Sequence, residues 1–113
     1  MMQGEIWLIN LDPTVGAEIK KTRPAVIVND NSLGKLPLKI IVPLTDWKYR
    51  YDVAQWMVKI LPDKINGLSK DSAADCFQIR SVAEERLIKR LGITSNAVME
   101  EIILALKLVL SIE

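Results

Sequence analysis

The segment from Asp12 to Pro24 carries several side chains that could bind a phosphate group. This glycine-containing loop runs into the start of an apolar stretch and holds Thr14, Glu18, Lys20, Lys21 and Arg23. A guanidinium is a planar fork of donors that matches phosphate oxygens, and the two lysines would add positive potential. Charged loops are also ordinary on protein surfaces. The same residues could therefore be solvated charges, with Arg23 in an ion pair at a strand edge.

A hydroxyl group later in the chain could act on the same phosphate. Thr45 ends the apolar run Ile40–Leu44 and precedes Asp46. If the strands around Arg23 and Thr45 are antiparallel neighbours, the end of one lies beside the start of the other. Threonine is also common at strand ends for structural reasons, so its interest depends on this neighbour.

Aromatic and cationic side chains alternate in the middle of the chain. Trp47, Tyr49, Tyr51 and Trp56 are interleaved with Lys48 and Arg50. Such a pattern can stack on unpaired bases and hold backbone phosphates, or the rings can fill a core or a subunit contact. Further on, the two-residue period of a strand puts Gln78 and Arg80 on one face. Gln78 could read a base edge, or the two could be a surface polar pair.

The sequence contains no histidine, and this removes several mechanisms. The commonest general acid–base and the commonest zinc ligand are missing, so a paired-histidine ribonuclease is excluded and serine catalysis lacks its base. Cys76, the single cysteine, is expected to be a small buried hydrophobe. The acidic pairs Asp71/Asp75 and Glu84/Glu85 are poor metal sites without further ligands. We expect no metal and no cofactor, which leaves hydrolytic routes that use arginine, threonine and a carboxylate.

Composition predicts one globular domain over residues 1–113. Half of the 113 residues are apolar, which suffices for one core. Fifteen basic and 14 acidic residues leave a net charge of +1, so binding to nucleic acid would require local placement of the charges. A lone cysteine fits a reducing compartment, and the apolar segment 102–112 is too short to span a bilayer. A cytoplasmic protein with no membrane contact is the expectation.

Short strands must position these residues. Runs rich in β-branched and aromatic residues predict strands over 5–10, 23–28, 39–42 (continuing to 45), 57–61, and within 73–82. The 11–22 connection is long for a hairpin, which is typical of functional loops, and Asn66–Gly67 indicates a turn. Five strands separated by turns predict a small curled antiparallel sheet or half-open barrel.

The C-terminal part is predicted to be helical. Residues 84–90 suggest a short helical turn that stops near Gly92, and Thr94 or Ser95 can cap a helix that runs to about Leu110. One stripe at helical spacing holds Val98, Ile102, Ala105, Leu106 and Val109. Met99, Ile103 and Leu110 widen it beyond what one core needs, which indicates a second packing partner such as another subunit.

An ordered series of sequence blocks resembles the MazF/PemK toxins, the mRNA interferases of type II toxin–antitoxin systems. The opening blocks are Gly4–Trp7, Leu11–Glu18 and Arg23–Val28. The later blocks, in the same order as in the family, are Val42–Thr45, Gln78–Val82, and Arg86–Leu87 leading into Leu91–Gly92 and a closing helix. The resemblance covers nearly the whole chain.

This resemblance implies a mainly β fold, an SH3-like (CcdB/PemK-type) antiparallel barrel with a C-terminal α-helix, in a homodimer. It implies sequence-selective, metal-independent cleavage of single-stranded RNA, neutralised by a cognate antitoxin protein. By position, Arg23 and Thr45 match the active-site arginine and threonine, and Glu18 matches a loop carboxylate. Gln78 falls in a block that lines the RNA groove. We expect Thr14, Lys20, Lys21 and Gln78 to bind RNA.

The residues allow one specific hypothesis for the chemistry. The ribose 2′-hydroxyl would attack the adjacent phosphorus, with Arg23 and Thr45 donating to the phosphoryl oxygens and Glu18 as the best candidate for proton transfer. Two other functions remain open on the same fold. One is a CcdB-like inhibitor of a topoisomerase (gyrase), and the other is an inactive RNA-binding relative.

Overall fold

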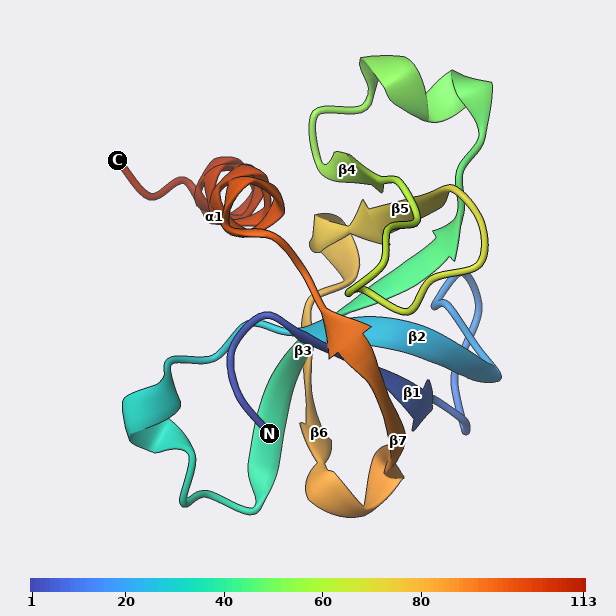
Figure 1. The fold of residues 1–113 in the computed structure, drawn as a ribbon. Helices are drawn as coiled ribbons and strands as arrows, with labels where there is room; N and C mark the ends of the chain where they lie inside the picture. Colours follow the sequence, from blue (N-terminus) through green and yellow to red (C-terminus); the bar gives the residue numbers. More distant parts are fainter.

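Seven antiparallel strands and one C-terminal helix make up the protein (Figure 1). The computed structural model describes residues 1–113. The elements are β1 (Glu5–Asn10), β2 (Thr22–Ile27), β3 (Leu38–Asp46), β4 (Met57–Ile60), β5 (Ser72–Asp75), β6 (Arg80–Ala83), β7 (Leu87–Ile93) and α1 (Asn96–Leu110). Their order is β4-β5-β3-β2-β1-β7, with β6 paired to β3. The outer strands β4 and β7 do not pair, so the expected mainly β, barrel-like fold is confirmed as an open one.

Strand β3 joins the two halves of the sheet. One edge of β3 pairs with β6 and then, from Leu44, with β5, and the other edge pairs with β2. The ladder between β2 and β3 ends at the pair Ala25–Pro43. Pro24 and Pro43 flank this point, and neither can donate a backbone hydrogen bond. The sheet therefore opens beyond this pair.

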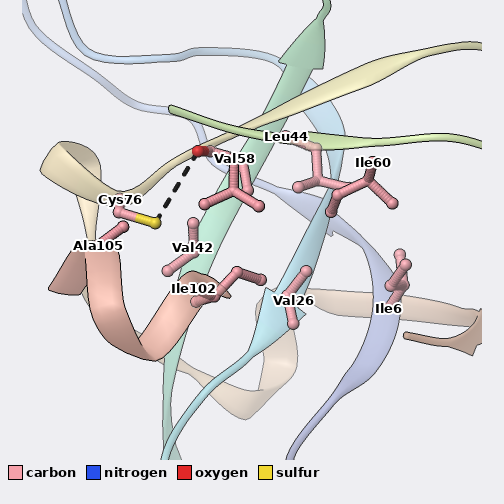
Figure 2. Close-up of a cluster of buried hydrophobic side chains, with 10 residues drawn as sticks. Ile6, Val26, Val42, Leu44, Val58, Ile60, Cys76, Ile102 and Ala105 are labelled. Atoms are coloured by element: carbon pink, nitrogen blue, oxygen red, sulfur yellow. Dashed lines mark hydrogen bonds between the residues drawn. The ribbon is translucent and has the colours of Figure 1, made fainter. Parts of the chain in front are cut away.

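Two hydrophobic clusters lie on opposite faces of the sheet, as the two-residue period requires. The first is shown in Figure 2 and consists of Ile6, Val26, Val42, Leu44, Val58, Ile60, Ala74, Cys76, Ile102 and Ala105. The second consists of Ile9, Leu11, Ala25, Ile27, Ile41, Val82 and Leu87. On β2, Arg23 shares the face of Ala25 and Ile27. On β3, Thr45 shares the face of Ile41, so both lie on the face away from the helix.

Helix α1 covers the first cluster and packs beside β4 and the 3₁₀ turn at Cys76–Gln78 (Figure 1). As predicted, it begins after Ser95, whose side-chain oxygen accepts from the amide of Val98 at 3.1 Å. Ile102 and Ala105 are buried, whereas Ile103 and Leu110, two of the residues expected to widen the stripe, are 40% and 54% exposed. The apolar surface of the helix is therefore wider than its contact with the sheet, as the sequence pattern indicated.

Two local predictions were wrong. The expected fifth strand within 73–82 is two strands, β5 and β6, separated by a 3₁₀ turn at Cys76–Gln78. The Asp75 side chain accepts from the amide of Phe77 and so stabilises the turn. In the segment 84–90, only Glu84–Arg86 is helical, and β7 begins at Leu87. Burial of Leu87 and its pairing with Ile9 of β1 outweigh the local helical preference.

The first cluster gives a prediction about stability. The side chain of Ile102 is fully buried, and its truncation to alanine leaves a cavity between α1 and the sheet. We expect Ile102→Ala to lower the free energy of unfolding by about 2–5 kcal/mol in urea denaturation. Ile88→Ala, at a position with 57% exposure, should change it by less than about 1 kcal/mol. Equal losses in the two variants would show that α1 is not packed as described.

Candidate active site

A hollow of about 450 Å³ opens where β3 leaves β2. Arg23 and Thr45 both line it, and the β2–β3 register, continued two residues past Ala25–Pro43, sets them opposite each other. The other lining residues are Lys21, Thr22, Pro24, Leu44, Asp46, Gly67, Leu68, Ser69, Lys70, Ser72 and Leu91. Strand pairing thus brings together two side chains that are far apart in the sequence.

Arg23 and Thr45 both have hydrogen-bond donors that other groups of the protein leave free. Arg23 is half-buried, and its one contact is a long hydrogen bond of 3.4 Å from Nε to the carbonyl of Lys20. It forms no ion pair, in contrast to the alternative considered from the sequence. The half-buried Thr45 hydroxyl forms no hydrogen bond within the protein. Both can therefore donate to a ligand.

The floor of the hollow depends on a close approach between two segments. Gly67 follows the buried Asn66 in a turn, with a φ of +72°, and a Cβ there would lie 2.1 Å from the carbonyl oxygen of Leu91. The side chain of Asn66 also donates from Nδ2 to the carbonyl of Leu61 at 2.8 Å, which holds the turn in place. The Asn66–Gly67 turn expected from the sequence therefore packs directly against β7.

The charge around the hollow is positive. Lys21, Arg23 and Lys70 line it together with a single carboxylate, that of Asp46. Lys70 Nζ lies 3.0 Å from the carboxylate of Asp46, so this negative charge beside Thr45 is paired. An exposed ion pair of this kind is weak and can rearrange around a bound anion. The chain is almost neutral as a whole, but this site has the local excess that a phosphate requires.

A second hollow of about 390 Å³ adjoins the first on the same face of β3. Pro43 lines it, two residues from Thr45 on the same side of the strand. Its other lining residues are Ala17, Glu18, Ile19, Phe77, Gln78, Ile79 and Arg80. Glu18 is exposed here, and its Oε1 accepts from the amide of Val15 at 2.6 Å. Glu18 and Gln78 thus lie next to the hollow of Arg23 and Thr45 and not inside it.

Polar contacts fix the 11–21 loop over this face. Gln78 Oε1 accepts from the amide of Ile19 at 2.6 Å, and Gln78 Nε2 donates to the carbonyl of Ala17 at 3.3 Å. At the other end of the loop, Arg80 donates to the carbonyl of Leu11, and Arg86 donates to the carbonyls of Asn10 and Asp12. In this state, the side chain of Gln78 positions the loop.

The remaining predicted RNA-binding residues are at the edge of the same loop. Lys21 has a left-handed φ of 71°, and its amide donates to Asp12 Oδ1 at 3.0 Å. Thr14 Oγ1 donates weakly to the same oxygen at 3.4 Å. The Lys20 side chain is exposed. Lys21 is the one member of this group that lines the hollow of Arg23 and Thr45.

The aromatic side chains of residues 47–56 belong to neither hydrophobic cluster. Trp47 meets Tyr51 edge to face at 5.9 Å between ring centroids, and Lys59 lies 5.1 Å from the centroid of Trp47. Tyr49 is 89% exposed, and Trp56 packs edge to face on Phe77. The rings therefore do not fill the core, and of these four only Trp56 lines one of the described hollows.

Cys76 is buried, as expected, and its thiol lies 3.9 Å from the carbonyl oxygen of Ala74 (Figure 2). Burial in the first cluster, reinforced by the charge of Asp75, raises the pKa of the Cys76 thiol to about 12. The group therefore stays protonated and is no nucleophile. No three side chains of the His, Cys, Asp and Glu types come together as a metal site.

Two proximities in the structure were not predicted from the sequence. Asp46 lies beside Lys70, and Arg80 lines the same hollow as Glu18. The first pair depends on β3–β5 pairing, which sets Asp46 opposite Ser72 and brings the preceding loop to the hollow. The turn at Asn66–Gly67 was the one feature of that loop predicted from the sequence. The sequence predicted that Arg80 and Gln78 share one face of a strand. Both line the second hollow, but Gln78 lies in the 3₁₀ turn and not in a strand.

Comparison with known proteins identifies the family. Residues 2–110 match the family described as PemK-like, MazF-like toxin of type II toxin–antitoxin system. The chain belongs to this family. It is 34% identical to endoribonuclease MazF9 of Mycobacterium tuberculosis, over 96% of this chain and 94% of that protein. It is 32% identical to endoribonuclease PemK of Escherichia coli, over 98% of this chain and 83% of that protein.

Solved structures of MazF-like toxins share the fold. MazF from Deinococcus radiodurans superposes with a TM-score of 0.82 at 23% identity, over 99% of this chain and 97% of that one. A mycobacterial endoribonuclease, solved in complex with its cognate antitoxin, gives a TM-score of 0.79 at 19% identity, over 100% and 97% of the two chains. The open, barrel-like architecture with a C-terminal helix is therefore the family fold.

The one α-helix is not of a length and apolarity that would cross a bilayer.

The contacts of Gln78 predict how the loop is held. Gln78→Ala removes the acceptor of the Ile19 amide, and one such hydrogen bond contributes about 0.5–1.5 kcal/mol. Amide hydrogen exchange at Ile19 should become about 2–12 times faster. Gln55→Ala, which removes an exposed glutamine outside the loop, serves as the control. Unchanged exchange at Ile19 in the Gln78 variant would mean that other contacts hold the loop.

Proposed function

We propose that this protein is a sequence-selective, metal-independent endoribonuclease toxin of the mRNA interferase type. The relatives described above are named endoribonucleases. The observation that carries the proposal is the pair Arg23 and Thr45, which line one cationic hollow with donor groups free for a ligand. Single-stranded RNA in the cytoplasm is the proposed substrate.

The proposed reaction is an internal displacement at phosphorus. The ribose 2′-oxygen forms a bond to the adjacent phosphorus as the bond to the 5′-oxygen of the next nucleotide breaks. The 2′-proton passes to a base, the departing 5′-oxygen takes up a proton, and the products are a 2′,3′-cyclic phosphate and a 5′-hydroxyl. Because the nucleophile belongs to the substrate, no activated protein nucleophile is needed. Arg23 and Thr45 stabilise the charge that develops on the phosphoryl oxygens.

Proton transfer is assigned to Glu18. A positioned acid–base group contributes roughly 10²–10⁴ in rate, whereas the always protonated Arg23 is a poor base. Glu18 lies in the adjoining hollow on the loop held by Gln78, so substrate binding must bring its carboxylate to the reacting ribose. Asp46 is the carboxylate nearer to Arg23, but Lys70 is paired with it.

The loop and the groove beside it supply the proposed binding partners. Thr14, Lys20, Lys21 and Gln78 would contact the RNA around the cleaved bond. A related endoribonuclease has been solved with its cognate antitoxin. We propose that an antitoxin also neutralises this chain, through an acidic segment that folds on binding and competes with RNA for the positive surface.

The exposed apolar surface of α1 supports a homodimer. Leu104, Leu108 and Leu110 are 65%, 52% and 54% exposed, an arrangement that disfavours an isolated subunit. We expect light scattering to give twice the mass of the chain. Leu104→Glu should shift the protein towards the monomer, whereas Lys107→Glu, which changes the charge of the same helix without removing apolar surface, should not. A monomeric wild-type protein would refute the proposed assembly.

The assigned roles predict the kinetics of two variants. Arg23→Ala and Thr45→Val each remove one donor to the developing charge, and losing such a donor typically costs about 10²–10³ in rate. Single-turnover cleavage of a long RNA, with excess chelator, should slow by about that factor in each variant. Arg90→Ala, in which the lost arginine is paired with Glu5 outside the hollow, should cleave normally.

Three results would contradict the proposal. Folded Arg23→Ala protein that cleaves at the wild-type rate would refute the role of this residue. A substrate in which the 2′-hydroxyl is replaced by hydrogen should bind without being cut, so its cleavage would exclude the proposed nucleophile. RNA that is bound by the wild-type protein but survives intact would identify an inactive RNA-binding relative.

A further inference from the structure

A third hollow continues the series that begins at Arg23 and Thr45. It has a volume of about 300 Å³ and is lined by Trp56, Asp75, Phe77 and Gln78. It shares Phe77 and Gln78 with the second hollow, and Pro43 of the second hollow is two residues from Thr45 of the first. The volume is at the lower end of the range of ligand pockets, roughly 300–1,000 Å³, and suits one small planar group.

Two exposed aromatic rings form the wall of this hollow. Phe77 is 66% exposed and Trp56 is 42% exposed, and their rings meet edge to face with centroids 6.4 Å apart at 65°. The backbone fixes both residues, because the amide of Cys76 donates to the carbonyl of Trp56 and the amide of Phe77 donates to Asp75. The two rings therefore lie together outside the core, where their faces can stack on a planar ligand.

Asp75 provides an acceptor at the base of the hollow. Only 6% of its surface is exposed, and it forms no ion pair. Its two oxygens accept from the amide of Phe77 and from Gln78 Nε2, both at 3.1 Å. An ionised carboxylate has about four acceptor positions, so Asp75 can still accept from a ligand. The Gln78 oxygen is already occupied by the amide of Ile19, so the carboxylate of Asp75 is the side-chain acceptor that this hollow offers.

We propose that Trp56, Phe77 and Asp75 form a subsite for one unpaired base of the RNA, next to the cleaved bond. The base stacks on the rings, and its exocyclic amino group donates to the carboxylate of Asp75. Cytosine has an amino group where uracil has a carbonyl oxygen, so the subsite selects cytosine over uracil. This inference rests on the proposed function, since it assigns part of the sequence selectivity of the same enzyme.

Binding of uncleavable probes tests the subsite without relying on cleavage. Fluorescently labelled octamers of deoxycytidine and of deoxyuridine differ at the amino group and lack the 2′-hydroxyl. The wild-type protein should bind the cytosine octamer about tenfold or more tightly. Asp75→Asn should lose this preference, whereas Asp71→Asn, at an exposed aspartate outside the hollow, should retain it.

Ring variants test the stacking contact. Phe77→Ala and Trp56→Ala should weaken the binding of both octamers by about tenfold, while Tyr49→Ala, which removes an exposed ring that lines none of the hollows, should not. Equal wild-type affinity for the two octamers, or a preference that survives in folded Asp75→Asn protein, would overturn the proposal. A change of molar mass in the ring variants would also overturn it, because the rings would then be a subunit contact.

The outcome separates this proposal from the proposed function. A wild-type protein that prefers the cytosine octamer but cuts no RNA would refute the endoribonuclease and leave the subsite in place. A protein that cuts RNA but shows no preference dependent on Asp75 would refute the subsite alone. Circular dichroism melting of each variant confirms that it is folded.

Discussion

The separation of β2 and β3 beyond the pair Ala25–Pro43 is the constraint on which the site depends. Paired strands would fill the space between them with a continuous ladder, but here the β2–β3 ladder ends while β3 stays paired with β5 on its other edge. Arg23 and Thr45 lie just beyond the last pair of the ladder, and both line the hollow that opens there. Two donors that line one hollow can bind one anion. The paired part of the sheet thus positions β2 and β3, and the end of the ladder leaves room for a ligand between them.

Local electrostatics compensates for the near neutrality of the chain. The acidic residues are placed so that they do not oppose an anion at the site, because Glu5 pairs with Arg90 and Asp46 pairs with Lys70. Loop contacts from Gln78, Arg80 and Arg86 go to backbone groups and not to carboxylates. The positive potential of the site is therefore not cancelled. Pre-positioned donors of this kind need little reorganisation when charge develops in the reaction.

The sequence predicted the parts of the structure that depend on local patterns. The first four strands and the capped helix follow from β-branched runs and from Ser95, and the antiparallel approach of Arg23 to Thr45 follows from strand order. Leu87–Arg90 was predicted to be helical, since its pairing with β1 is remote in sequence. The ion pair of Asp46 with Lys70 and the enclosure of Asp75 by Trp56 also arise from tertiary contacts. No local pattern could have predicted them.

A crystal structure of the protein with an RNA analogue that carries one 2′-deoxy nucleotide at the cleavage position tests the central claim most directly. The account predicts that the Arg23 guanidinium and the Thr45 hydroxyl donate to non-bridging oxygens of the same phosphate, between β2 and β3. A phosphate at the cleavage position bound elsewhere, or contacts of the two side chains with different phosphates, would contradict it.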